Sequence, residues 1–213
     1  MFKPTHRAMA ITAAVGGSLA LSAQPMAAAV IIISARATAM VPDKMEKIFG
    51  VKMQNHRTWT HWLVTCVLAG IVIGLIVYGI GYGAAELIHS RMHGHDGRHL
   101  AHIMRISAYG YGILIGVGAV IGSVMHSLAD ACTIGGVPLF GPFYKKKVWL
   151  MPDGLRCGVG DKEKMQKEYE RTGKIKAVLT PGEKTWFLSS YLATAAILFL
   201  HFAPVLRLKG VPA

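Results

Sequence analysis

Three long apolar stretches constrain the fold of this chain more than any other feature. Residues 62–87 carry no charge before Glu86, and residues 106–125 and 185–206 contain no Lys, Arg, Asp or Glu. Each stretch can cross a hydrocarbon core of about 30 Å as a helix of about 20 residues. The charged fraction of 16% is also low, since about 25% is usual in a soluble domain. The sequence therefore predicts a membrane protein, with helices over about 60–88, 103–131 and 185–206.

The first 42 residues contain two weaker candidate helices, about 8–23 and 26–41, which Gln24 and Pro25 separate. One interpretation is a secretory signal peptide, because Lys3 and Arg7 precede a short apolar run that ends in small residues. The other is a tight helical hairpin, because small residues let helices approach closely in lipid. With the hairpin, the chain is an all-α, polytopic membrane bundle of about five transmembrane helices in a single domain, residues 1–213.

The distribution of charge predicts the orientation. With five helices, one side of the membrane receives the N-terminus, residues 43–59 and a long loop, residues 144–184, which together hold 17 of the 23 Lys and Arg residues. By the positive-inside rule this side is cytoplasmic. Topology thus explains the net charge of +12 without nucleic-acid binding. Lys145, Lys146 and Lys147 could attract anionic lipid or a phosphorylated amphiphile, although a membrane anchor is the simpler interpretation.

Imidazoles and carboxylates gather at the predicted cytoplasmic ends of the first four helices. Odd-numbered helices begin and even-numbered helices end on that side, so topology alone brings these residues to one membrane face. Ionisable groups at that depth are costly unless they are paired or bind metal. Neutral imidazoles with carboxylates suit Zn²⁺ or Mn²⁺. The predicted ligands of this divalent metal site are His6, Asp43, His56, His61, His126 and Asp130.

Spacing refines this prediction. His126 and Asp130 are four residues apart, which places both side chains on one face of a helix. His56 and His61 are five apart, about 140° around a regular helix at 100° per residue. Both can face one ion only if His56 lies in a loop and a helix begins near Thr58 or Thr60.

A second group of histidines lies between the third and fourth predicted helices, at the opposite membrane face. Some have ligand-like spacing of four residues, but Gly94 and Gly97 interrupt a continuous helix and Asp96 is the one carboxylate nearby. A solvated polar loop is the favoured prediction for His89, His93, His95, His99 and His102.

At these motifs the sequence resembles the YdjM-like family of bacterial inner-membrane proteins, predicted metal-dependent hydrolases. The similarity spans roughly residues 1–160, in order and with compatible gaps. Because it places Thr5-His6 inside the mature protein, it favours the hairpin over a cleaved signal peptide. The shared motif residues are Thr5-His6, Pro42-Asp43, His56-Arg57, Thr60-His61, His126, Asp130, Thr133, residues 136–139 and Pro142-Phe143.

The chain departs from the family pattern in three places. Met45 stands where the family has a second Asp, with Glu46 one position later, and Thr58 and Trp62 replace a Gly and a Ser. Loss of a carboxylate could remove a ligand or the general base, so a non-catalytic membrane scaffold is one alternative.

The resemblance implies that the matched His and Asp residues are metal ligands and that the chemistry is hydrolysis of an amphiphilic ester or phosphoester in the bacterial inner membrane. Asp130 or Asp43 would accept a proton from the attacking water, and Arg57 would stabilise anionic charge in the transition state. A metal-binding transporter or sensor is a further alternative. It would need ionisable residues in the middle of the last three helices, where the sequence offers only His201, near the end of the last one.

Overall fold

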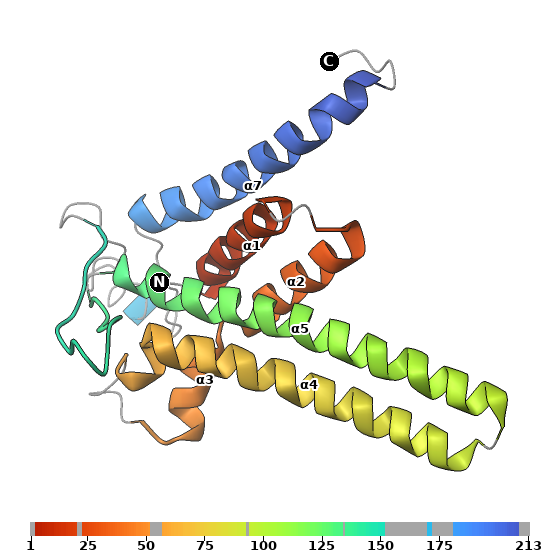
Figure 1. The fold of residues 1–213 in the computed structure, drawn as a ribbon. Helices are drawn as coiled ribbons and strands as arrows, with labels where there is room; N and C mark the ends of the chain where they lie inside the picture. The colour runs from red at the N-terminus through yellow and green to blue at the C-terminus, as the bar shows by residue number, and fades with distance from the viewer. Residues whose placement is uncertain are drawn as a thin grey trace.

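The computed structural model describes residues 3–20, 23–51, 57–92, 94–133, 135–151, 170–171 and 181–208, the last helix with side chains only for residues 184–198. Over these residues the fold is all-α, apart from one isolated bridge between Val137 and Val148. Figure 1 shows one long helical pair with shorter helices packed along one half of it.

The long pair is formed by α4 (Leu63–Arg91) and α5 (His95–Ala131), which run antiparallel (Figure 1). Glycines allow their backbones to meet: a Cβ atom on Gly74 would lie 2.7 Å from the carbonyl oxygen of Gly112 and 3.0 Å from the Cα of Gly116. Small residues at helix contacts are what close packing in lipid requires. The pair therefore forms the frame on which the remaining elements are placed.

The N-terminal residues form the helical hairpin, with α1 (Lys3–Ala20) and α2 (Pro25–Thr38). Pro25 suits the first turn of α2, where its missing N–H group costs no hydrogen bond. The hairpin packs on α5, where a Cβ atom on Gly122 would lie 2.3 Å from the carbonyl oxygen of Ala35. On its other side α1 contacts α7 (Pro181–Leu208), and Thr12 donates a 2.8 Å hydrogen bond to the carbonyl oxygen of Ser190.

A short helix, α3 (Val41–Ile48), was not predicted. It bends 42° away from α2. Proline cannot donate the helical hydrogen bond and its ring clashes with the preceding turn, so Pro42 separates α3 from α2. The predicted second helix, 26–41, therefore ends early at Thr38. The residues that follow it are helical rather than loop.

Over the described residues the structure gives two to three candidate membrane spans, where the sequence predicts five. Two helices, α4 and α5, are long and apolar enough to cross a membrane, and α2 with α3 makes a third candidate if the bent pair is one span. α1 does not meet the same criteria of length and hydropathy, and α7 is described with side chains over residues 184–198 only. The structure thus supports an all-α membrane fold with two to three candidate spans.

Helix boundaries also differ from the prediction. The first helix begins at Lys3 rather than residue 8, and α5 begins at His95 rather than residue 103. Gly94, with φ of 112°, makes the turn before α5, and Gly97 sits inside the helix against the Met92 carbonyl, where a Cβ atom would lie 2.2 Å away. Most of the predicted loop, 144–184, lies outside the described residues.

Candidate metal centre

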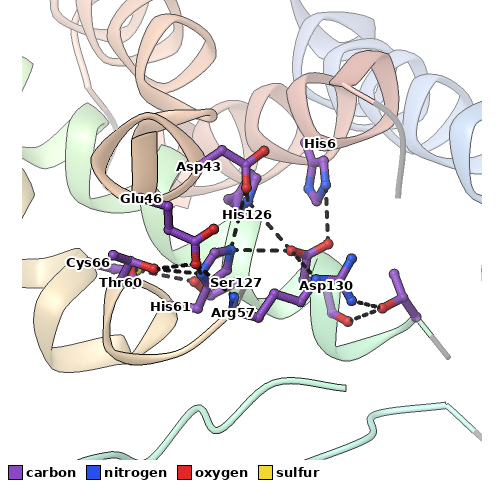
Figure 2. A network of polar contacts seen from close by, with 11 residues as sticks. His6, Asp43, Glu46, Arg57, Thr60, His61, Cys66, His126, Ser127 and Asp130 are labelled. Carbon is purple, nitrogen blue, oxygen red and sulfur yellow. Dashed lines mark hydrogen bonds and ion pairs between the residues drawn. The ribbon is translucent and has the colours of Figure 1, made fainter. Parts of the chain in front are cut away.

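Five separate polar side chains converge at the end of the α4–α5 pair where α4 begins and α5 ends. His6 comes from α1, Asp43 from α3, His61 from the short 3-10 helix η2 (Trp59–His61), and His126 and Asp130 from the last turns of α5. Figure 2 shows these side chains pointing toward one another. His61 and His126 are fully buried, and His6 and Asp130 are 2% exposed. The cluster is therefore an interior site.

Four of these residues form a donor set that fits one metal ion. Asp43, His61, His126 and Asp130 each offer one ligand atom, and these atoms all lie within 4.8 Å of one another. The Nε2 atom of His61 is 3.4 Å from Asp130 Oδ2, and the Nε2 atom of His126 is 3.3 Å from Asp43 Oδ1. Two imidazoles with two carboxylates suit Zn²⁺ or Mn²⁺.

The environment of His126 supports the same interpretation. Both of its ring nitrogens are buried, Nδ1 has no hydrogen-bond partner within the described residues, and Nε2 lies 3.3 Å from Asp43 Oδ1 and 3.6 Å from Asp130 Oδ2 without the geometry of a regular hydrogen bond. Leaving such a group unsatisfied costs about 1–3 kcal/mol. An Nε2 atom that faces two carboxylates instead of a donor is in the position of a metal ligand, so the residues present fit a divalent ion.

His6 lies beside the four-residue donor set. Its ring stacks on that of His126 with centroids 4.0 Å apart, and its Nε2 atom is 3.4 Å from Asp130 Oδ1. It therefore contacts the Asp130 oxygen that faces away from His61. The predicted ligand His56 lies outside the described residues.

Arg57 reaches the cluster from an unusual backbone conformation. Its φ of 65° is uncommon for a residue other than glycine. Its Nε atom is 3.2 Å from Asp130 Oδ2, and its Nη1 atom donates to the hydroxyl of Thr133, which in turn donates to the Asp130 carbonyl. Arg57 thus helps to orient the Asp130 carboxylate, as outer partners of metal ligands do, and Thr133 holds Arg57 through its hydroxyl.

Glu46 is a member of the site that sequence reasoning missed. It is only 5% exposed, and its Oε1 atom accepts hydrogen bonds from the Thr60 hydroxyl at 2.8 Å and from the Arg57 backbone N–H at 2.7 Å. The same oxygen lies 3.3 Å from His61 Nδ1, the ring nitrogen opposite the donor set. Glu46 therefore pairs with the outer nitrogen of a candidate ligand.

A signal for Glu46 was present in the sequence. Residues three apart share a face of a helix, so Asp43 and Glu46 point the same way once α3 is recognised. Met45, at the position of the family's second Asp, is half-buried. Glu46, one position after Met45, is thus a second carboxylate that α3 brings to the site.

The carboxylates around His61 make the cluster attractive to cations. Burial by itself lowers the pKa of His61, but contacts with Asp130, Asp43 and Glu46 outweigh it and raise the pKa to about 10. Without a metal ion, His61 is therefore protonated at neutral pH and supplies positive charge among the carboxylates. A divalent cation would take the place of that proton.

The histidines at the opposite end of the α4–α5 pair do not converge. His89, His95, His99 and His102 are exposed. The His95 and His99 rings stack with centroids 6.3 Å apart, and no group of three metal-donor residues forms there among the residues that the structure describes. His93 lies outside them.

Comparison with known proteins places the chain in a family. No curated protein and no solved structure matches it. The family model described as YdjM inner membrane protein matches residues 1–203, a range that contains every residue of the candidate metal centre. The chain therefore belongs to the YdjM family of inner membrane proteins.

Proposed function

We propose that this protein is a membrane-embedded, metal-dependent hydrolase of an amphiphilic ester or phosphoester. One observation carries the proposal: two imidazoles and two carboxylates, brought from α3, η2 and α5, place their donor atoms within 4.8 Å of one another. Family membership supports a setting in the inner membrane.

Asp43, His61, His126 and Asp130 would hold the ion, with Zn²⁺ or Mn²⁺ as the metals that suit this donor set. A divalent ion in such a site acts as a Lewis acid and makes water a stronger nucleophile at neutral pH. His6, Glu46 and Arg57 keep the ligands in position, through stacking on His126 and through contacts with His61 and Asp130.

Asp43 is the better candidate for the proton acceptor. Its side chain is 30% exposed, whereas that of Asp130 is 3% exposed and lies against His6 and Arg57. In hydrolysis the water oxygen bonds to the acyl carbon or phosphorus and the bond to the leaving alcohol breaks. The Asp43 carboxylate oxygen that does not hold the ion can take the proton from the water and return it to that alcohol. Arg57 adds a fixed positive charge beside the cluster, which would stabilise a developing anion.

The proposal includes the predicted topology of five transmembrane helices, with the N-terminus and residues 144–184 in the cytoplasm. In that topology the donor set lies at the cytoplasmic interface, where the reacting bond of an amphiphile is within reach. The position of the cluster at one end of both α4 and α5 supports this arrangement.

Elemental analysis of the purified full chain tests the metal site. We expect stoichiometric Zn or Mn in the wild-type protein and loss of that metal in His61→Ala and Asp130→Ala. His99→Ala, in the exposed histidine group, serves as the matched control and should retain the metal. Full metal content in His61→Ala and Asp130→Ala would show that the assignment is wrong. Ester and phosphoester hydrolysis should stop when a chelator removes the ion and return when the ion is restored.

A further inference from the structure

A cavity of about 360 Å³ lies between the start of α1 and α3 and reaches the candidate metal centre. Asp43 and Glu46, two carboxylates of the centre, form part of its wall. The cavity is also lined by four exposed basic side chains, and we call it the basic pocket: Lys3, Arg7, Lys44 and Lys47.

The positive charge of the basic pocket is built by helix geometry. Lys3 and Arg7 are four residues apart on α1, and Lys44 and Lys47 are three apart on α3, so each pair lies on one face of its helix. Like charges at these spacings destabilise a helix slightly. Within the described part of the chain none of the four forms a recorded ion pair with a carboxylate. A contribution to fold stability therefore does not explain why the four basic residues of the pocket lie together.

The charge balance indicates the ligand. Four basic groups and two carboxylates line the pocket, which leaves a formal excess of two positive charges. A phosphate monoester carries about −1.5 to −2 charges at pH 7 and offers three acceptor oxygens. A neutral carboxyester would leave these cations without a partner. The volume lies within the range of small-molecule sites, so a phosphate with part of its alcohol fits.

We propose that the basic pocket binds the phosphate of a phosphomonoester lipid and delivers its ester bond to the metal centre. This inference rests on the proposed hydrolase function, whose substrate class it narrows. Lys3, Arg7, Lys44 and Lys47 hold the anionic headgroup, and Asp43 lies where the pocket meets the donor set.

Apolar side chains next to the pocket favour a lipid as the source of the phosphate. Ile48 is 78% exposed and Phe49 is 62% exposed, directly after Lys47. The Phe49 ring packs edge-on against Trp59 with centroids 5.3 Å apart. A short helix with basic residues on one side and large apolar residues at its end suits the headgroup boundary of a bilayer. There the acyl chains stay in the membrane while the phosphate enters the pocket.

Calorimetric titration of the full chain in detergent, stripped of metal with a chelator, tests phosphate binding without reference to activity. The titrants are dihexanoyl phosphatidic acid, glycerol 3-phosphate and, as the zwitterionic control, dihexanoyl phosphatidylcholine. We expect the double variant Lys44→Gln/Lys47→Gln to bind phosphatidic acid about tenfold more weakly. Each lysine contributes to the free energy of binding an anionic group, and salt reduces that contribution. Arg91→Gln/Arg98→Gln removes the same charge at the opposite end of the α4–α5 pair and should bind as the wild type does.

Each result decides one part of the proposal. If both double variants bind phosphatidic acid equally more weakly than the wild type, or if both bind it as the wild type does, the basic pocket is not the phosphate site. Tighter binding of phosphatidic acid than of glycerol 3-phosphate supports a lipid source, and equal affinities would overturn it in favour of a soluble phosphomonoester.

Metal content of the same preparations before chelation separates this inference from the hydrolase proposal. Absence of metal, with phosphate binding that depends on Lys44 and Lys47, refutes the hydrolase and leaves an anion site. Stoichiometric metal with phosphate affinity unchanged in Lys44→Gln/Lys47→Gln refutes the pocket alone.

Discussion

The two ends of the α4–α5 pair carry similar residues in different environments. At one end His126 and Asp130, four residues apart, are buried with His61, and Asp130 Oδ2 lies 3.4 Å from His61 Nε2 and 3.6 Å from His126 Nε2. At the other end His95 and His99, also four apart, lie in the open beside Asp96, and the side chains of His95 and Asp96 are 89% and 102% exposed. The buried end receives α1, α3 and η2 as well, whereas within the described part of the chain the exposed end has only the turn between α4 and α5. Ligand-like spacing becomes a donor set only where further chain segments enclose it.

The largest expected effect is removal of a ligand at the buried end. His126→Ala should weaken metal binding by more than about 100-fold, because loss of even an outer partner of a ligand typically costs 10–100-fold. His95→Ala, at the exposed end, should leave the affinity unchanged. Competition with a chromogenic chelator measures both. Equal metal affinities of His126→Ala and His95→Ala would show that the buried end does not differ from the exposed end in metal binding.

Glu46 tests whether the enclosure matters beyond the four donors. Glu46→Gln keeps the shape and the hydrogen-bond acceptor but removes the charge 3.3 Å from His61 Nδ1. We expect metal affinity to fall by about 10–100-fold, with Asp96→Asn as the matched carboxylate control at the exposed end. Unchanged affinity in Glu46→Gln would show that Glu46 serves only the fold.

Much of this buried end could be predicted from the sequence. Alternation of the predicted helices places the start of the first and third and the end of the second and fourth at one end of the bundle. The structure brings His6, Asp43, His61, His126 and Asp130 together at such an end. The sequence says less about the secondary structure around Pro42. The residues after it are charged and lack a long apolar face, so neither α3 nor the role of Glu46 was predicted. The position of Arg57 depends on a positive φ that no local pattern indicates.

The pH dependence of metal binding should also distinguish the buried end. The three carboxylates near His61 raise its pKa to about 10, so at neutral pH a metal must displace one proton from this imidazole. Metal affinity should therefore rise about tenfold per pH unit between pH 6 and 8. In the metal-free protein the charged His61 stabilises the fold fully below its usual pKa of 6.5, and that contribution is lost as the pH rises through 10.

Calorimetry of metal binding in two buffers with different ionisation enthalpies counts the released protons. A value near one per metal supports the displacement. Binding that releases no proton and has the same affinity at pH 6 and 8 would contradict it.

The smallest expected effect concerns an ion pair between α4 and α5 in the half of the pair that leads to the exposed end. Arg105 pairs with Glu86 through two 2.9 Å contacts, and the side chains are 35% and 42% exposed. If these groups meet water at the membrane surface, Glu86→Gln should lower the free energy of unfolding by less than about 1 kcal/mol. It should not change metal affinity, because the pair lies at the opposite end of α4 and α5 from the donor set. Denaturant unfolding in detergent and in lipid bicelles measures the first quantity. A loss of unfolding free energy well above 1 kcal/mol that occurs only in bicelles would mean that the Arg105–Glu86 pair lies within the hydrocarbon region, where a broken ion pair is costly. The exposed end of α4 and α5 would then extend less far into water than its exposed histidines suggest.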